Sequence, residues 1–159
     1  MAVWKDELPR IRRARWASDR DALRQVRRRV FVLEQGIPEH LEWDGLDEAA
    51  AHLLAVDRAG DPAGTARLLP SGQIGRMAVL PEWRGRGLGS ALLREILAIA
   101  LADGRPAPFL YAQVSALPFY VRHGFVPTGD ELEEAGIPHR KMTLGLFFQA
   151  VSSKSASTD

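Results

Sequence analysis

An apolar strand, a glycine-rich turn and an apolar helix follow one another in this chain, and this succession constrains the fold more than any other feature. Residues 73–80 (QIGRMAVL) are typical of a buried strand, and residues 88–102 are apolar on most sides of a helix, which should therefore be buried. A second apolar strand, residues 109–114, follows a break at Gly104 and two prolines. Strand–helix–strand units of this kind are right-handed and pair their strands in parallel, which places the chain in the α/β class.

Further strands and helices are predicted on both sides of this unit. Before it the sequence predicts a strand at 10–16, a helix at 19–34, an acidic irregular connection at 35–51 and a hairpin of strands at 51–57 and 64–70. After it come a short helix at 116–124, a strand that starts at 125 and a last strand at 139–148. We therefore expect a single domain over residues 1–148, with a mixed, mostly antiparallel central sheet flanked by helices, and a polar, disordered tail at 149–159.

The first helix is preceded and followed by charged residues. Ser18 and Asp21 resemble a capping box, so the helix is expected to begin near residue 19 and to present Arg24, Arg27 and Arg28 outward. This basic start is interpreted either as a solvated helix face balanced by the acidic stretch that follows, or as a surface for nucleic acid or an anionic ligand. The net charge of only +1 favours the first interpretation, and no nucleic-acid partner is expected.

Composition excludes several kinds of chemistry. The chain has no cysteine, which excludes disulfides, thiolate metal sites and cysteine nucleophiles. Its four histidines show no ligand spacing, so no metal is expected. No apolar run approaches the roughly 20 residues that span a bilayer, and the mixed, charged N-terminus does not resemble a signal peptide. We expect a cytoplasmic protein with no membrane partner.

The turn between the strand and the helix has the composition of an anion site. In RGRGLG (84–89), glycines let a ligand approach the backbone, the following helix offers unpaired N–H groups, and arginines add positive charge. The other interpretation is a tight turn whose glycines only permit packing. A P-loop is excluded because Ser90 and Ala91 stand where a Lys-Ser/Thr pair is needed, and the dinucleotide fingerprint also fails on spacing.

These residues resemble the GNAT superfamily of acyl-CoA N-acyltransferases. RGRGLG is similar to its R/Q-x-x-G-x-G/A signature, and ALPFYVRHGF (116–125) is similar to its A-x-x-x-Y-x-x-x-G-F segment. The stretches VFVLEQGIPEHLEWDGLD and EEAGIPHRKM resemble a bacterial ElaA-like or YjcF-like subgroup. The resemblance spans roughly residues 10–148 and implies an acetyl-CoA co-substrate. The cofactor-binding residues that it implies are Met77, Ala78, Val79, Arg84, Gly85, Arg86, Gly87, Leu88, Gly89, Ser90, Gln113 and Tyr120.

The same resemblance assigns Tyr120 as the general acid that protonates the departing thiolate. A phenol has a pKa of about 10 and stays protonated at neutral pH. Many relatives carry Asn where this chain has Gln113, whose longer amide can still contact the pantetheine. The general base is Glu34 or His139, although strand packing is the other role open to His139. Glu34 and the acidic loop at 39–48 are hypothesised to bind a cationic amine; the alternative is a surface loop that neutralises the arginines.

The leading functional hypothesis is an N-acetyltransferase in which a primary amine directly attacks acetyl-CoA within a ternary complex. The acceptor would be a small-molecule or peptide amine. The alternative is a non-catalytic, acyl-CoA-binding regulatory protein on the same fold. An exposed sheet edge would allow a homodimer.

Overall fold

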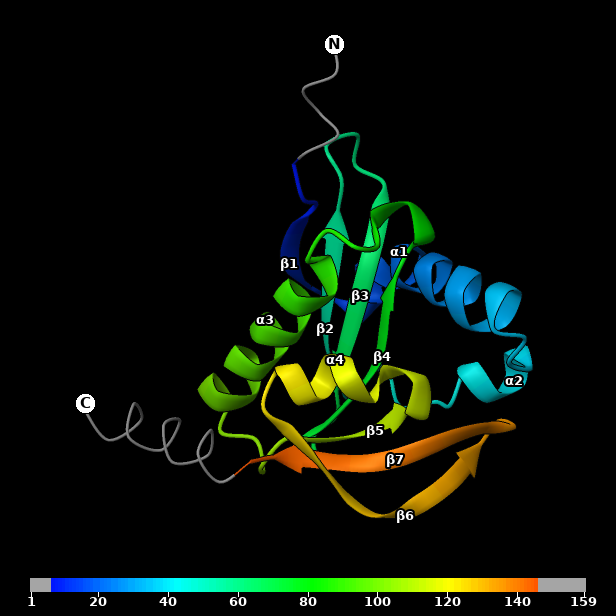
Figure 1. The fold of residues 1–159 in the computed structure, drawn as a ribbon. Coiled ribbons are helices and arrows are strands. Elements are labelled where there is room, and N and C mark those ends of the chain that lie inside the picture. Colours follow the sequence, from blue (N-terminus) through cyan, green and yellow to red (C-terminus); the bar gives the residue numbers. More distant parts are fainter. Residues whose placement is uncertain (1–6, 146–159) are drawn as a thin grey trace, which may run out of the picture.

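The computed structural model describes residues 7–145, which form one mixed sheet with helices on both faces (Figure 1). The predicted tail and the end of the predicted last strand lie outside these residues. The helices are α1 (Trp16–Arg27), a π-helical turn (Arg28–Glu34), α2 (Glu39–Glu42), a 3-10 turn (Pro81–Trp83), α3 (Leu88–Ala102), a second 3-10 turn (Val114–Ala116) and α4 (Leu117–Arg122). The strands are β1 (Arg10–Ala14), β2 (Ala51–Val56), β3 (Pro62–Leu68), β4 (Gln73–Val79), β5 (Phe109–Gln113), β6 (Phe125–Glu134) and β7 (Ile137–Leu144).

The sheet has the order β1-β2-β3-β4-β5-β7-β6, and of its described pairs only β4 with β5 is parallel. The α/β class, the mostly antiparallel sheet and the parallel crossover through α3 are thus confirmed. Strands β1 and β6 form the two edges. The homodimer through a sheet edge stays a prediction.

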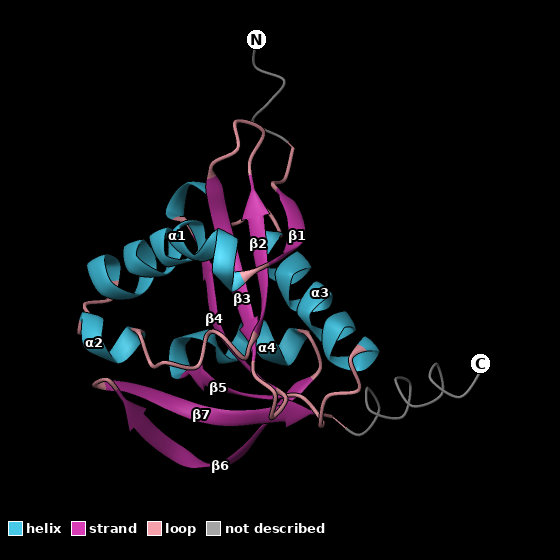
Figure 2. Ribbon diagram, turned by 180° about the vertical axis from the view of Figure 1, so that it is seen from behind, coloured by secondary structure: helices cyan, strands magenta, loops and turns pink. Residues whose placement is uncertain are grey.

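Helices α1 and α3 cover opposite faces of the sheet (Figures 1 and 2). Neighbouring residues in a strand point to opposite faces, and Leu53 and Leu54 of β2 are both almost fully buried. Leu53 belongs to the core that α3 covers, whereas Leu54 packs with Leu23 of α1. Helix α3 buries one face only, and Leu101 on its other side is 49% exposed. The expectation that this helix is buried on most sides is therefore wrong for its outer face.

The predicted start of the first helix is also wrong. Helix α1 begins at Trp16, three residues earlier than expected, and Ser18 lies within its first turn. The cap is made by Asp19, whose carboxylate accepts a hydrogen bond of 2.8 Å from the backbone N–H of Arg15 and pairs with Arg12 at 2.8 Å. Because a carboxylate in the first turn satisfies a free N–H group, no hydroxyl cap is needed.

Arg27 does not face the solvent as predicted, because it is 1% exposed. Its Nε lies 2.8 Å from Glu42 and its Nη1 lies 2.7 Å from Asp47. The acidic connection is thus a partner for buried arginines and not simply a surface loop, and it contains the short helix α2. Burial raises the pKa of Glu42, and the charges of Arg76 and Arg27 oppose that shift without cancelling it.

Two arginines of the sheet complete this cluster. Arg67 of β3 contacts Asp44 at 2.8 Å and Asp47 at 3.1 Å. Arg76 of β4 contacts Glu42 at 2.9 Å and Asp44 at 3.1 Å. The ion-pair cluster therefore joins three arginines to three carboxylates, so its formal charges balance. It holds the connection between α2 and β2 against the sheet.

Strands β6 and β7 form a hairpin, although only the start of β6 was predicted from the sequence. The two-residue loop of the hairpin is Ala135–Gly136, and both residues have positive φ, 52° and 77°. This is the geometry of a type I′ turn, whose twist matches that of the flanking strands. Strand β6 consequently continues to Glu134, and β7 begins at Ile137, two residues before the predicted strand.

We predict that Arg27→Met lowers the free energy of unfolding by about 3–5 kcal/mol, since the buried carboxylates of Glu42 and Asp47 each lose one of their two arginine partners. Arg28→Met is the matched control. Arg28 is exposed and lies 3.7 Å from Glu39, so its loss should change stability by no more than about 0.5–1 kcal/mol. Urea denaturation of both variants measures the difference. Equal stabilities would contradict a structural role for the cluster.

Candidate active site

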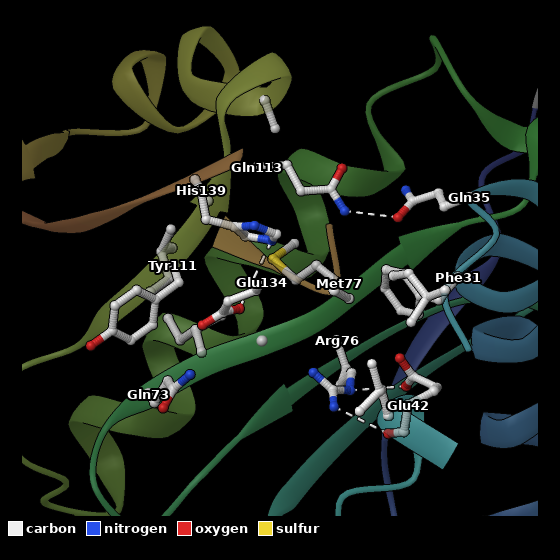
Figure 3. Close-up of a pocket in the computed structure, with 18 of the residues that line it drawn as sticks. Phe31, Gln35, Glu42, Gln73, Arg76, Met77, Tyr111, Gln113, Glu134 and His139 are labelled. Carbon is white, nitrogen blue, oxygen red and sulfur yellow. Dashed lines mark hydrogen bonds and ion pairs between the residues drawn. The ribbon is translucent and has the colours of Figure 1, made fainter. Parts of the chain in front are cut away.

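A cavity opens where β4 and β5 separate. The two strands pair only at Gln73–Phe109 and Ile74–Leu110, and then diverge. The resulting cavity has a volume of about 490 Å³ and is lined from β4, β5, the π-helical turn and the β6–β7 hairpin (Figure 3). From β4 and β5 themselves it is lined by Gln73, Ile74, Gly75, Arg76, Met77, Leu110, Tyr111, Ala112 and Gln113.

A β-bulge lies on β4 beside this cavity. Thr65 pairs with Ala78 and Arg67 pairs with Gly75, so Arg76 and Met77 together oppose a single residue of β3. Arg76 has a φ of 48°, which is unfavourable for a residue with a side chain. Its ion pairs with the buried cluster hold it in place. The bulge turns β4 at the point where it leaves β5.

The glycine loop follows β4 directly and leads into α3. Gly85 and Gly87 have φ values of 74° and 90°, and Gly87 is the residue that precedes the helix. A Cβ at either glycine would meet no atom within 4 Å, so the requirement for glycine is conformational and the loop backbone is open on that side. The first N–H groups of α3 are free of helical partners, as at every helix start.

The side chains of this loop bind within the protein. Arg84 donates from Nε to the carbonyl of Val79 at 2.9 Å and forms two hydrogen bonds to Glu34, at 2.7 and 2.8 Å. Arg86 stacks on the ring of Trp83 at 5.1 Å. Arg84 therefore fixes the loop to β4 and to the end of the π-helical turn.

Other predicted cofactor residues face in different directions. Ala78 packs with Val26 under α1, and Leu88 is part of the core, so only their backbones are available to a ligand. The Ser90 hydroxyl lies 2.8 Å from Nε2 of His123. A Cβ on Gly89 would lie 3.6 Å from Phe119, within ordinary contact distance.

Tyr120 of α4 lines the cavity, and its hydroxyl points to the sulfur of Met77 at 3.7 Å. Burial raises the pKa of Tyr120 to about 12. Its ring makes edge contacts with Phe119 and Phe125, which fix its orientation. The phenol therefore stays protonated throughout the neutral range.

Gln113 and His139 are cross-strand neighbours on β5 and β7. Gln113 donates from Nε2 to the side-chain oxygen of Gln35 at 2.7 Å, across the cavity. His139 has Nδ1 at 2.7 Å from the carbonyl of Ile137. Because a carbonyl only accepts, Nδ1 carries the proton in neutral His139, and Nε2 keeps a lone pair. Nε2 lies 3.9 Å from the Glu134 carboxylate.

Glu34 does not line the cavity. Hydrogen bonds from Arg84 are the main reason why the pKa of Glu34 is lowered. Of the acidic loop, Leu41 and Glu42 reach the cavity wall, and Glu42 is held by arginines. Glu134, which the hairpin brings beside His139, was not predicted from the sequence. The signal was Ala-Gly after Glu134, a dipeptide compatible with a two-residue turn.

Comparisons with known proteins agree with this geometry. The family model of the acetyltransferase (GNAT) domain matches residues 20–146. The chain is 38% identical over 122 residues to a Bacillus subtilis (strain 168) protein named uncharacterized N-acetyltransferase YjcF, covering 74% of this chain and 86% of that protein. One similar solved structure is an acyl-CoA N-acyltransferase from Pseudomonas aeruginosa, with 33% sequence identity and a TM-score of 0.78, covering 87% of this chain and 100% of that chain. Another is Escherichia coli ElaA, with 29% sequence identity and a TM-score of 0.77, covering 86% of this chain and 99% of that chain.

The chain therefore belongs to the GNAT acetyltransferase family. Its similarity to ElaA and YjcF confirms the resemblance to that subgroup. Membership implies transfer of an acyl group from coenzyme A to an amine. Within residues 7–145, no set of three or more histidine or carboxylate side chains is arranged to hold a metal ion. In the same part of the chain, no helix has both the length and the apolar character that crossing a bilayer requires.

Proposed function

We propose that this protein is an N-acetyltransferase in which a primary amine attacks acetyl-CoA directly within a ternary complex. The observation that supports it most is the course of β4. Its ladder with β5 ends at Ile74, and the strand then leads past the cavity into the glycine loop. A thioester with a long amide-bearing arm and a pyrophosphate fits such a path, because free backbone groups bind the arm and a helix start binds the phosphates.

Each part of the co-substrate has a proposed binding segment. The backbone of Gly85–Ser90, with the charge of Arg86, would hold the pyrophosphate. The backbone of Met77–Val79 would pair with the pantetheine, to which Gln113 adds an amide. The thioester would then lie near Tyr120, whose hydroxyl is beside Met77.

The proposed transfer uses two proton-carrying side chains. The amine nitrogen bonds to the thioester carbon as the carbon–sulfur bond breaks. His139 Nε2 accepts the proton that the nitrogen loses, and Tyr120 donates a proton to the leaving thiolate. Tyr120 then regains its proton from solvent. The products are an acetamide and the free thiol of coenzyme A.

Of the two candidate bases, the geometry favours His139. It lines the cavity with a lone pair on Nε2, and Glu134 would stabilise the imidazolium that forms. Glu34 lies outside the cavity in a two-bond pair with Arg84, which stabilises its charged form. We infer that Glu34 positions the glycine loop through Arg84.

Calorimetric titration with acetyl-CoA tests the donor site. We expect wild-type protein to bind and Arg86→Glu with Gly87→Trp to lose binding, since the variant reverses the charge and fills the open loop. Arg94→Glu makes the same charge change at an exposed position of α3 and should bind like wild type. If folded wild-type protein does not bind acetyl-CoA, the glycine loop has only a structural role and the proposal is refuted.

Tyr120→Phe should lower kcat about a hundredfold or more, the range of a lost general acid. Its dissociation constant for acetyl-CoA should stay nearly unchanged, because the hydroxyl is proposed to act on the thiolate that forms during transfer, and its one hydrogen bond among the described residues is to Met77. Steady-state assays of released thiol, together with calorimetry, measure both quantities. Full turnover by the variant would remove Tyr120 from the mechanism.

His139→Ala should also lower kcat about a hundredfold, and added imidazole should restore part of the rate by filling the vacated space. Glu34→Ala is the comparison. It should keep kcat close to wild type and weaken acetyl-CoA binding, because Arg84 loses its partner. The reverse pattern, with Glu34 limiting kcat, would assign the base to Glu34.

A further inference from the structure

The charged groups that line the cavity are unequal in what they can offer a ligand. The charged side chains are Glu42, Arg76 and Glu134, and the cavity is also lined by the ionisable His139. Glu42 and Arg76 belong to the ion-pair cluster, whose three arginines and three carboxylates balance one another. Neither brings an uncompensated charge to the cavity.

Glu134 is different. Its side chain is 52% exposed, and its one ion-pair partner among the described residues is His139, at 3.9 Å. No arginine or lysine within residues 7–145 forms an ion pair with it. With His139 neutral, as a base must be, the cavity carries one unbalanced negative charge beside the nitrogen that would take up a proton.

The side of the cavity opposite Glu134 contains an apolar patch. Figure 3 shows Glu134 and His139 on one side of Met77, and Phe31 on the other side, where Gln35, Arg76 and Glu42 also lie. Ile37 and Leu41 extend this apolar patch from the segment that follows the π-helical turn. Methylene groups of a ligand can be buried against such a surface, with the charged end at the carboxylate.

We propose, on the basis of the acetyltransferase function above, that the acceptor is an aliphatic primary amine that carries no carboxylate or phosphate and is bound as an ammonium ion by Glu134. The ammonium gives one proton to His139 Nε2, from which it passes to solvent, and the neutral amine then attacks. An acceptor with its own carboxylate near the amine meets repulsion from Glu134. Arg76 cannot compensate that charge, since Glu42 and Asp44 already hold its guanidinium.

In this proposal the β6–β7 hairpin binds the acceptor, and the acidic loop at 39–48 does not. Leu132 lies opposite His139 in the hairpin register, and Glu134 lies opposite Ile137. Because side chains alternate along a strand, Glu134 shares the face of His139 while Glu133 points to the other face. Glu133 therefore supplies a matched control of equal charge on the same strand.

Pairs of amines that differ only by a carboxylate test this inference. Cadaverine is compared with lysine, agmatine with arginine, and tyramine with tyrosine, each assayed for kcat/KM with acetyl-CoA. We expect the amine without a carboxylate to be preferred by about tenfold or more, the effect of roughly one charge-assisted contact. Glu134→Gln should raise KM for cadaverine by a similar factor and reduce the preference. Glu133→Gln should match wild type.

Two binding measurements separate this inference from the function on which it rests. Acetyl-CoA is titrated into the wild type, and cadaverine is titrated into the wild type and Glu134→Gln with coenzyme A present. Acetyl-CoA binding together with equal use of amines and amino acids overturns the acceptor class alone. The acceptor class is also overturned if the protein binds acetyl-CoA but neither acetylates nor binds any amine of the panel. Absence of acetyl-CoA binding overturns both proposals.

Discussion

The contact between Arg76 and the carboxylates of α2 and its following loop is the interaction on which the rest of the site depends. Arg76 lies on the bulge of β4 with a positive φ, and Glu42 and Asp44 hold its guanidinium. The bulge lies where β4 leaves β5, and the cavity exists because the two strands separate. Since Glu42 also binds Arg27, one cluster connects the first helix, the acidic connection and the open part of the sheet.

The cavity has two sides with different chemistry. Toward the glycine loop, β4 offers backbone groups, which suit a co-substrate of constant structure such as coenzyme A. Toward the β6–β7 hairpin, the wall is made of side chains, with Glu134 and His139 facing Phe31. Specificity for the acceptor would therefore depend on a few side chains of one hairpin, while the donor site depends on backbone geometry.

Much of the fold could be predicted because its signals are local. Apolar strands and the glycine turn before α3 determined the parallel crossover, and the motif around Tyr120 indicated α4. Two predictions failed for different reasons. Arg27, in a run of basic residues, was predicted to be exposed, but partners 15 and 20 residues away bury it. The start of α1 was misplaced because Asp19 caps it through a contact that a hydroxyl motif does not describe.

The sequence by itself determined the α/β class, the order of its elements and the family, since these follow from hydrophobic periodicity, glycine positions and motif spacing. Only the tertiary structure decided which charges face the cavity. Arg27, Arg76, Glu42 and Asp44 look like surface residues in the sequence, yet they pair with one another, and Arg27 and Glu42 are buried. Glu134 at the cavity forms no ion pair with an arginine or lysine of the described residues. The physical reason is that the environment of a charge depends on partners distant in the chain, which local patterns do not specify.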